Sequence, residues 1–345
     1  MNKIMRKIIP VYLIFAFTAN VYAASGGAAF LKKGVGARAL GMGGAFTSVS
    51  NDTSAVYWNP AGLAQVQDYS ITVMGSAAAS DKWPGQKDAA ASHNFAAFSV
   101  PVSKFTDALA GSVFALGLLN STLDNVTKSD DYGNELGAFS DSQNAVFLSW
   151  GMPVWESNTN LYVGLSLKYI MEKMDGIDGG SASGYDIDAG VLYNIFETLN
   201  FGLFIGKGAR MKWDGGESDN AALTARFGVS NTFALTDKLF ILGSTDLLQR
   251  QKEPLSCNAG FELSYLGIYD AGAFGLSGLY LRAGAEGFAL ENRYGVRDTI
   301  NGNINYAVGF GVDMSILGKY LQLDYALGLG GSFDRHSKIS LNFYF

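Results

Sequence analysis

Apolar residues alternate with small or polar residues along most of the chain. In 319–329 one face carries Leu321 and Leu323, and the other carries Gln322 and Asp324. Successive side chains of a β-strand point to opposite faces, so such a segment has one apolar and one polar face. Each segment is about as long as a tilted strand that crosses a bilayer. The pattern predicts an all-β fold, a transmembrane antiparallel β-barrel with one face in lipid and one facing the lumen.

Fourteen segments show this alternation with varying clarity. They are 68–79, 91–102, 108–121, 143–154, 159–172, 183–195, 198–209, 223–234, 237–248, 257–269, 278–290, 303–313, 319–329 and 337–345. The segment 237–248 does not alternate cleanly, and Gly243 predicts a β-bulge there, because glycine inside a strand often marks one. No stretch after the N-terminal region has the roughly 18 consecutive apolar residues of a membrane helix.

The connections between these segments alternate in length. Those after odd-numbered segments, such as 122–142 and 210–222, are long and rich in Asp, Gly, Ser and Asn. Most of the others, such as 155–158 and 196–197, are short. Long extracellular loops and short periplasmic turns are typical of an outer-membrane barrel. The exception is 270–277, which is long for a turn.

The stretch 34–64, GVGARALGMGGAFTSVSNDTSAVYWNPAGLA, differs from the rest of the chain. Glycine permits positive φ, proline fixes φ, and asparagine before proline favours a turn. The stretch is therefore expected to be compact and irregular, with small side chains that let it press against other backbone. We predict that residues 24–67 form an N-terminal hatch, which plugs the lumen of a barrel formed by 68–345.

This stretch also carries a family resemblance. GARALGMGGAF, then Asp52, then AVYWNPAGLA resembles the N-terminal signature of the PorV/PorQ family of bacterial outer-membrane proteins, and it is more distantly similar to the FadL family of outer-membrane transporters. The resemblance implies a barrel of about fourteen strands with a hatch inside. The bounds of the segments that alternate less clearly are chosen to match that number of strands. The motif residues are Arg38, Gly41, Gly43, Gly44, Asp52, Trp58, Asn59, Pro60, Ala61 and Gly62.

Residues 1–23 have the pattern of a secretory signal peptide. Lys3, Arg6 and Lys7 supply the positive region, an apolar run follows, and cleavage is expected after Ala23. The sequence thus predicts export to the bacterial outer membrane.

Composition narrows the choice of partners. The chain of 345 residues is 48% hydrophobic but only 16% charged, and 43 residues are glycine. The net charge of −6 argues against a nucleic-acid partner, which would require a basic surface. Cys257 is the single cysteine, so it forms no internal disulfide, and it lies too far from the N-terminus to be a lipid-anchored cysteine.

The C-terminal segment also fits a barrel. LQLDYALGLG and SKISLNFYF match the PorV/PorQ pattern, and the last segment places Leu341, Phe343 and Phe345 on one face. A terminal phenylalanine on an alternating last strand resembles the signal that the outer-membrane assembly machinery recognises. That machinery and outer-membrane lipid are therefore expected partners.

Several charged residues fall on the polar face and are expected to point into the lumen. They are Lys168, Glu172, Asp186, Asp188, Arg226, Glu262, Arg282, Glu286, Asp313, Asp324 and Lys338. We expect most of them to pair with one another in a wet interior. Arg38 is expected to pair with a wall carboxylate and hold the hatch, because arginine offers five donors in a fixed fork. Trp58 and Tyr57 either pack on the wall or line an apolar pocket.

Enzymatic motifs are missing from the sequence. It has no G-x-S-x-G, H-E-x-x-H or Walker loop, and neither His93 nor His336 has a metal-ligand neighbour at i+2 or i+4. No cofactor or metal is expected, and an outer-membrane lipase is the best enzymatic alternative. Exposed aromatic residues are expected in the outer loops, as an interfacial girdle or a contact surface: Trp83, Tyr132, Phe139, Trp213 and Tyr294.

Two non-enzymatic functions remain. The PorV resemblance implies a component of type IX-like protein secretion that binds exported cargo proteins and hands them on at the cell surface. The FadL resemblance implies passive transport of a hydrophobic small molecule across the outer membrane. An apolar pocket inside the barrel would favour transport. A filled lumen with an apolar groove at the extracellular mouth would favour protein binding.

Overall fold

The computed structural model describes residues 27–76, 81–82, 90–106, 109, 111–130, 132, 134–155, 158–196, 198–270, 274–290, 304–329 and 337–345. The predicted signal peptide, 1–23, lies outside these residues. So do Trp83, Tyr294 and His336.

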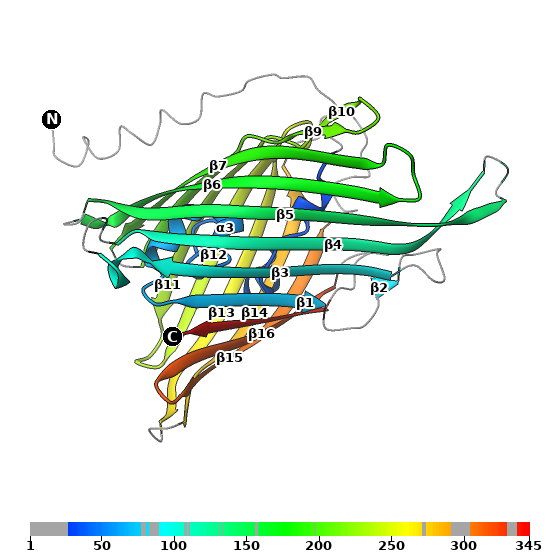
Figure 1. Cartoon of the computed structure of the whole chain (residues 1–345). Helices are drawn as coiled ribbons and strands as arrows, with labels where there is room; N and C mark the ends of the chain where they lie inside the picture. Colours follow the sequence, from blue (N-terminus) through cyan, green and yellow to red (C-terminus); the bar gives the residue numbers. More distant parts are fainter. Residues whose placement is uncertain are drawn as a thin grey trace.

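Fourteen strands form one closed antiparallel barrel, as predicted (Figure 1). The barrel closes because β1 pairs with β3 on one side and with β17 on the other. The fourteen are β1 (Ser70–Ser76), β3 (Ala90–Pro101), β4 (Val113–Ser129), β5 (Glu135–Trp155), β6 (Asn158–Asp175), β7 (Ser181–Ile195), β8 (Leu199–Gly206), β11 (Thr224–Ala234), β12 (Leu239–Arg250), β13 (Ser256–Asp270), β14 (Phe274–Ala289), β15 (Asn305–Ile316), β16 (Lys319–Gly328) and β17 (Ser337–Tyr344).

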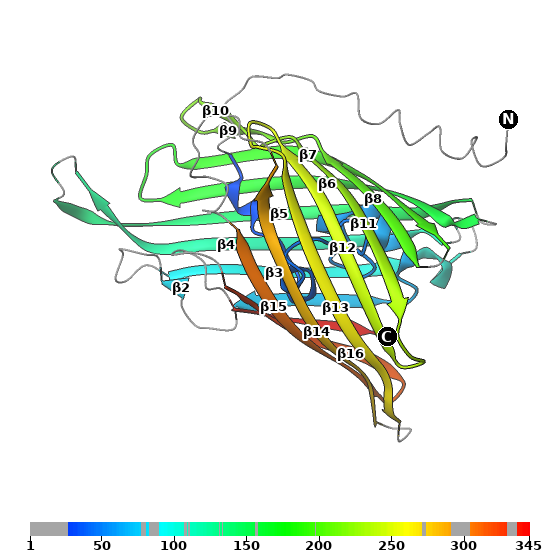
Figure 2. The ribbon, with the colours of Figure 1, turned by 180° about the vertical axis from the view of Figure 1, so that it is seen from behind.

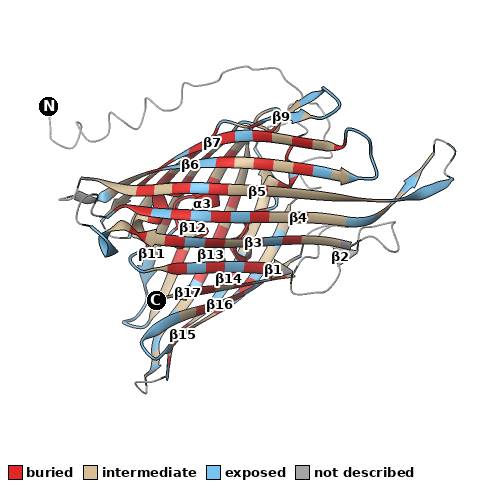
Figure 3. Ribbon diagram, viewed as in Figure 1, coloured by how far each residue is buried: buried red, intermediate tan, exposed pale blue. Residues whose placement is uncertain are grey.

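Burial alternates along the strands, which is visible as the banding in Figure 3. On β7, Asp186 and Asp188 are buried in the interior, whereas Tyr185 and Ile187 are exposed on the outside. The outer surface is thus mainly apolar and the interior largely polar, the inverse of a soluble β-sandwich. No helix among the described residues is long and apolar enough to cross a membrane.

The two ends of the barrel differ. At one end, called the turn end, a strand begins within a few residues of the end of the one before it: β5 ends at Trp155 and β6 begins at Asn158, and β15 ends at Ile316 and β16 begins at Lys319. The expectation of a long connection at 270–277 was wrong, because β13 and β14 continue to Asp270 and Phe274 and leave only 271–273 between them.

The other end, called the loop end, carries the long connections. Two of these contain more strand than expected. Most of 122–142 belongs to a β4–β5 ribbon that projects past the neighbouring strands (Figure 1), and 210–222 contains β9 (Arg210–Trp213) and β10 (Ser218–Asn220). A two-residue strand, β2 (Asp81–Lys82), pairs with β3.

The bulge expected at Gly243 is absent. Gly243 pairs with Asn231 and with Phe261 in unbroken register. The inward positions of β12 include Leu242 and Leu248, both of which are buried. These two leucines hid the alternation in the sequence, because they face the hatch rather than lipid.

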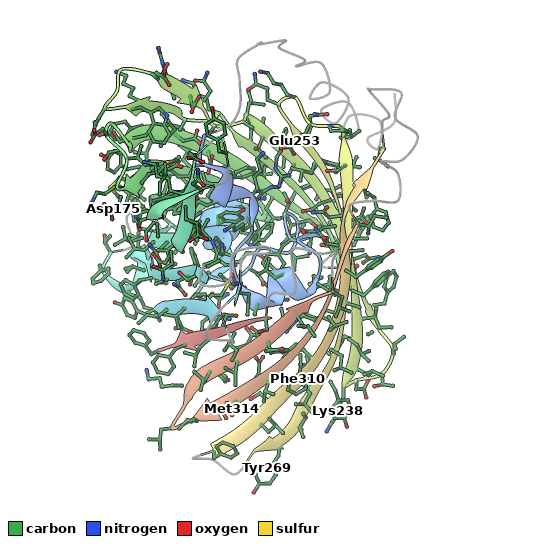
Figure 4. The ribbon with its side chains drawn as sticks, turned by 90° about the vertical axis from the view of Figure 1, so that its right-hand side faces the viewer. Asp175, Lys238, Glu253, Tyr269, Phe310 and Met314 are labelled. Carbon is green, nitrogen blue, oxygen red and sulfur yellow. The ribbon has the colours of Figure 1, made fainter. Side chains whose placement is uncertain are left out.

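The hatch lies inside the ring of strands (Figures 2 and 4). It is compact and mostly irregular, as expected, but it also contains short helical turns: η2 (Ala29–Lys32), α2 (Ala37–Gly41), α3 (Ala55–Trp58) and η3 (Pro60–Gln65). No turn exceeds six residues. The hatch begins near the loop end, where Lys32 contacts Glu253, and it leaves at the turn end, where Tyr69 contacts Phe345.

An aromatic stack covers the seam between the first and last strands. The Phe345 ring stacks on Tyr69 at 5.8 Å and on Phe343 at 5.3 Å between centroids. The Phe345 N–H donates to Tyr69 O at 3.0 Å. Leu341, also on the outer face of β17, pairs with Val73 of β1 and Leu323 of β16. Recognition of these residues during assembly stays a prediction.

Deleting Phe345 is expected to lower the yield of folded barrel several-fold. One aromatic pair contributes about 0.5–1.5 kcal/mol, which is small for a closed barrel, so the molecules that do fold should melt near the wild-type temperature. The measurement is the heat-modifiable band on a gel, together with thermal unfolding of the purified fraction. Phe345→Tyr, which keeps the ring, serves as the control. Equal yields for all three chains would refute an assembly role.

Candidate functional site

The Asn59 side chain ties two parts of the hatch to the wall. Its Nδ2 donates to Thr47 O at 2.9 Å and to Val191 O, on β7, at 3.1 Å. Its Oδ1 accepts from Ala61 N at 3.2 Å and so caps η3. Pro60 opens η3, a position where its missing N–H costs nothing. The N-P-A-G motif is therefore a structural anchor inside the barrel.

Wall glycines let this turn approach the barrel closely. Gly151, Gly164 and Gly190 pair side by side on β5, β6 and β7. A Cβ at Gly164 would overlap the Pro60 backbone, and one at Gly190 would overlap the Asn59 amide. Hatch backbone thus lies directly against wall backbone, which only glycine permits.

The Gly-rich part of the hatch makes a similar contact with the other side of the barrel. Gly43 has φ 62°, and a Cβ there would lie 2.5 Å from Ala285 N on β14. A Cβ at Gly41 would lie 3.1 Å from Gly309 Cα on β15. Gly44 has φ 69°. The glycines of the motif therefore serve backbone conformation and close packing, not phosphate binding.

Three more motif residues shape the hatch from within. Asp52 Oδ1 accepts hydrogen bonds from Ser54 N at 2.8 Å and from Ser54 Oγ at 2.5 Å. Ala61 is fully buried, and a Cβ at Gly62 would overlap Ser50 O. These contacts stabilise the polar turn between Phe46 and α3.

Arg38 forms a forked ion pair with the wall. Its Nε and Nη2 lie 2.9 and 3.0 Å from the two carboxylate oxygens of Glu262 on β13, and its Nη1 donates to Asn51 Oδ1 at 2.7 Å. Burial opposes the charge, but the Glu262 carboxylate outweighs it and raises the pKa of Arg38. The guanidinium therefore stays charged at any pH at which the protein is folded. A role for this pair in holding the hatch remains a prediction.

The same carboxylate joins a wider network across the wall. Arg282 Nε lies 2.6 Å from Glu262 Oε2, and its Nη1 lies 2.7 Å from Asp324 Oδ1. The side chains of Arg282 and Asp324 are inaccessible to solvent. Four alternating charges thus link α2 to β13, β14 and β16, so each buried charge has a partner.

Arg226, on β11, lies among aromatic rings. Its guanidinium carbon lies 4.7 Å from the Phe204 ring centroid, 5.1 Å from that of Trp58 and 5.4 Å from that of Tyr57. Its Nη1 also donates to Trp58 O at 3.3 Å. Trp58 and Tyr57 therefore pack against a buried cation, and neither faces an apolar pocket. Both side chains also donate hydrogen bonds within the hatch. Trp58 Nε1 donates to Val35 O, and Tyr57 Oη donates to Leu31 O.

Asp246 is a site residue that sequence reasoning missed. Its Oδ2 accepts from Phe46 N at 3.1 Å and from Thr47 N at 2.9 Å. It lies on β12, the segment whose alternation was obscured by Leu242 and Leu248. Predicting that Asp246 faces inward would have required placing Leu242 and Leu248 on the inward face as well.

Two cavities lie beside the hatch, within the described residues. They measure about 50 and 20 Å³. Arg226 and Tyr57 line both, and Lys168 and Asp188 also line the larger one. Lys168 Nζ lies 2.7 Å from Asp186 Oδ2 and 2.9 Å from Asp188 Oδ1. Such a space has the size of one or two water molecules and a charged lining.

The remaining predicted residues are scattered. His93 is buried on β3, with Nε2 2.8 Å from Gly34 O, so it binds the hatch. Trp213 is half-buried and donates to Asp219, and Phe139 is half-buried on β5, whereas Tyr132 is 91% exposed. No group of three or more metal-ligating side chains occurs in the described part of the chain.

Comparison with known proteins identifies the fold. No family model matches the chain, and no curated protein matches it. Among solved structures, the toluene transporter TodX of Pseudomonas putida has a TM-score of 0.56 at 11% identity, covering 90% of this chain and 99% of that one. TbuX, the toluene transporter of Ralstonia pickettii, has a TM-score of 0.52 at 13% identity, covering 90% of this chain and 97% of that one.

A FadL homologue of Pseudomonas aeruginosa gives a TM-score of 0.51 at 12% identity, covering 94% of this chain and 98% of that one. At such identities the likeness establishes the architecture alone. It agrees with the more distant of the two resemblances noted in the sequence. The PorV/PorQ resemblance stays a prediction, because none of these structures is a PorV or PorQ protein.

Replacing Arg38 by alanine is expected to raise the ion conductance of the barrel several-fold. Removing one partner of a buried pair costs about 3 kcal/mol, because the other charge remains in place. Conductance in planar bilayers is the measurement. Lys104→Ala is the matched control, since it removes a cation paired with Asp68 on the exposed surface. Unchanged conductance in Arg38→Ala would contradict a role in holding the hatch.

Proposed function

We propose that this chain is a non-enzymatic barrel of the bacterial outer membrane that carries hydrophobic small molecules across that membrane. The observation that supports this best is the architecture: a closed fourteen-stranded barrel with an N-terminal hatch seated in the lumen. About nine-tenths of the chain shares that architecture with two toluene transporters and a FadL homologue.

The outer surface supports the membrane location. Its exposed side chains are large and apolar along successive strands, such as Leu165 and Leu167 on β6, Ile187 on β7 and Ile205 on β8. In water such a continuous apolar surface would cause non-specific association, whereas in a membrane lipid tails solvate it. A closed barrel also leaves no strand edge unpaired in the hydrocarbon.

In this proposal the structure is the closed state. Toluene would not fit a space of 50 Å³ lined by charged groups. Passage therefore requires the hatch to move relative to some part of the wall. The wall contacts of the hatch differ around the barrel, so the part that yields can be inferred.

The buried charged residues of the wall gather on one side. Those described lie on β6, β7, β11, β12, β13, β14, β16 and β17, whereas none lies on β1, β3, β4 or β5. On β4 and β5 the hatch instead meets Leu119, Ala145 and Phe147, and Tyr57 packs edge-on against Phe147 at 6.4 Å. An apolar molecule is poorly solvated beside charges. We therefore place its route between the hatch and the β4–β5 wall.

A disulfide across this contact is expected to lower transport at least fivefold. Val56 Cγ2 lies 2.9 Å from the position of a Cβ on Gly117 of β4, which is within disulfide reach. The chain would carry Val56→Cys, Gly117→Cys and Cys257→Ser. Uptake of radiolabelled toluene and oleate by bacterial cells that lack such a transporter is the measurement, made before and after reduction.

A second cross-link serves as the control. Ala37 N lies 3.1 Å from Ser340 Oγ on β17, on the charged side of the barrel. Ala37→Cys with Ser340→Cys should leave uptake within about twofold of the reduced protein. Equal inhibition by both cross-links would overturn the route but not the function. Uptake of both probes no faster than in cells without the barrel would overturn the proposed function.

Binding of exported proteins at the loop end is a second candidate function. The observation that favours it is the projecting β4–β5 ribbon, whose tip is held by Asp130. Its Oδ1 accepts from Tyr132 N at 2.9 Å and from Asn134 N at 2.8 Å. A fixed tip that presents an exposed tyrosine suits a protein contact, because little side-chain entropy is lost on binding.

If the ribbon binds cargo, Tyr132→Ala is expected to reduce the capture of secreted proteins by the purified barrel several-fold. The measurement is mass spectrometry of proteins retained from the culture medium of the same organism. Tyr320→Ala is the control, since that tyrosine is exposed at the turn end. Equal recovery with both variants would exclude the ribbon tip as the cargo site.

A further inference from the structure

Three cations lie close together on the outer wall near the loop end. Lys207 follows β8, and Arg210 and Lys212 belong to β9; all three are exposed. Met211, between the last two, is fully buried and would contact a Cβ on Gly27 of the hatch. Because neighbouring side chains on a strand point to opposite faces, Arg210 and Lys212 point outward. We call these three residues the basic cluster.

Pairing with β7 fixes the position of the cluster. Lys212 pairs with Ser183, and Lys207 N donates to Ile187 O at 3.1 Å. The cations therefore lie on either side of Tyr185, whose side chain is 76% exposed on the same outer face. Ser183, opposite Lys212, and Ile187, opposite Lys207, are four residues apart on β7, which is about 13 Å. A ligand with two phosphate groups can span this distance.

The cluster is not neutralised by the protein. Within the described residues, no carboxylate lies within 4 Å of Lys207, Arg210 or Lys212, whereas Lys173 nearby is paired with Asp175 at 2.6 Å. Arg210 makes one long contact, from Nη2 to Ser218 Oγ at 3.4 Å. In a chain of net charge −6, three adjacent cations without counter-ions are unusual.

The cluster lies at the border of the apolar surface. Ile187 lies beside Lys207 on β7, and Ile205 lies farther along β8; both are exposed. On β6 the Tyr169 ring lies 4.8 Å from that of Tyr185. Exposed tyrosines next to an apolar band are typical of the level of lipid headgroups. The cations thus face the headgroup layer, with apolar wall beneath them for acyl chains.

We propose that the basic cluster binds the phosphate groups of an anionic lipid in the leaflet at the loop end. Arg210 offers a planar fork that matches phosphate oxygens, and the two lysines add point charges. Tyr185 contacts the headgroup, and the acyl chains lie along Ile187 and Ile205. This inference rests on the membrane location given under the proposed function, but not on transport.

The test is binding of bisphosphorylated lipid A to the purified barrel in non-ionic detergent, followed by native mass spectrometry. The variant carries Lys207→Gln, Arg210→Gln and Lys212→Gln. The matched control carries Lys128→Gln, Lys252→Gln and Lys319→Gln, three exposed lysines elsewhere, and so has the same net loss of charge. Circular dichroism and heat-modifiable mobility confirm that each chain is folded.

Wild type and control are expected to retain one lipid A molecule, and the variant to bind it at least tenfold more weakly. Dephosphorylated lipid A should bind weakly to all three chains. Equal binding by variant and control, or equal binding of the dephosphorylated lipid, would overturn the proposal. Displacement by equimolar inorganic phosphate would also overturn it, in favour of a free-phosphate site. Loss of toluene uptake alone would leave the lipid site standing.

Discussion

The structure depends on direct contact between the backbone of the hatch and the backbone of the wall. At Gly164 and Gly190 the wall has no Cβ, and at Gly43 the hatch has none, so the two come together without intervening side chains. Contact at this distance leaves no room for water between the two backbones. Interiors packed this closely have discrete arrangements, so a hatch that moves must shift as a unit rather than deform gradually.

Close packing makes an unpartnered polar group at the interface costly. Asn59 supplies hydrogen bonds to Thr47 and Val191, Asp246 accepts two hatch N–H groups, and Glu262 receives two guanidinium groups. A buried polar group without such a partner would cost about 1–3 kcal/mol. The charged side of the lumen is thus a consequence of seating irregular backbone in a barrel. On β4 and β5 the hatch meets apolar side chains such as Leu119, Ala145 and Phe147.

This asymmetry connects the hatch to the proposed function. Ion pairs and hydrogen bonds are directional and hold the hatch on the β11–β17 side, whereas apolar packing around Val56 and Phe147 has no preferred direction and can be replaced by an apolar ligand. The outer wall shows a similar division into apolar and charged surface. In the membrane location proposed above, the exposed apolar band faces lipid tails and the basic cluster at its border faces the headgroup layer.

The alternation in the sequence determined most of the strands and most of the charged residues that face inward, and the family resemblance supplied the number of strands. A period of two is a local property, and side chains such as Asp186, Asp324 and Lys338 alternate with the apolar residues and so mark the inward face. Tertiary structure decided the partners: that Arg38 meets Glu262, that Asp246 caps the hatch, and that Leu242 and Leu248 face inward. It also decided that Lys207, Arg210 and Lys212 gather beside Tyr185, because β9 folds back onto β7. These contacts join residues far apart in sequence, and no local pattern encodes which strand a side chain will meet.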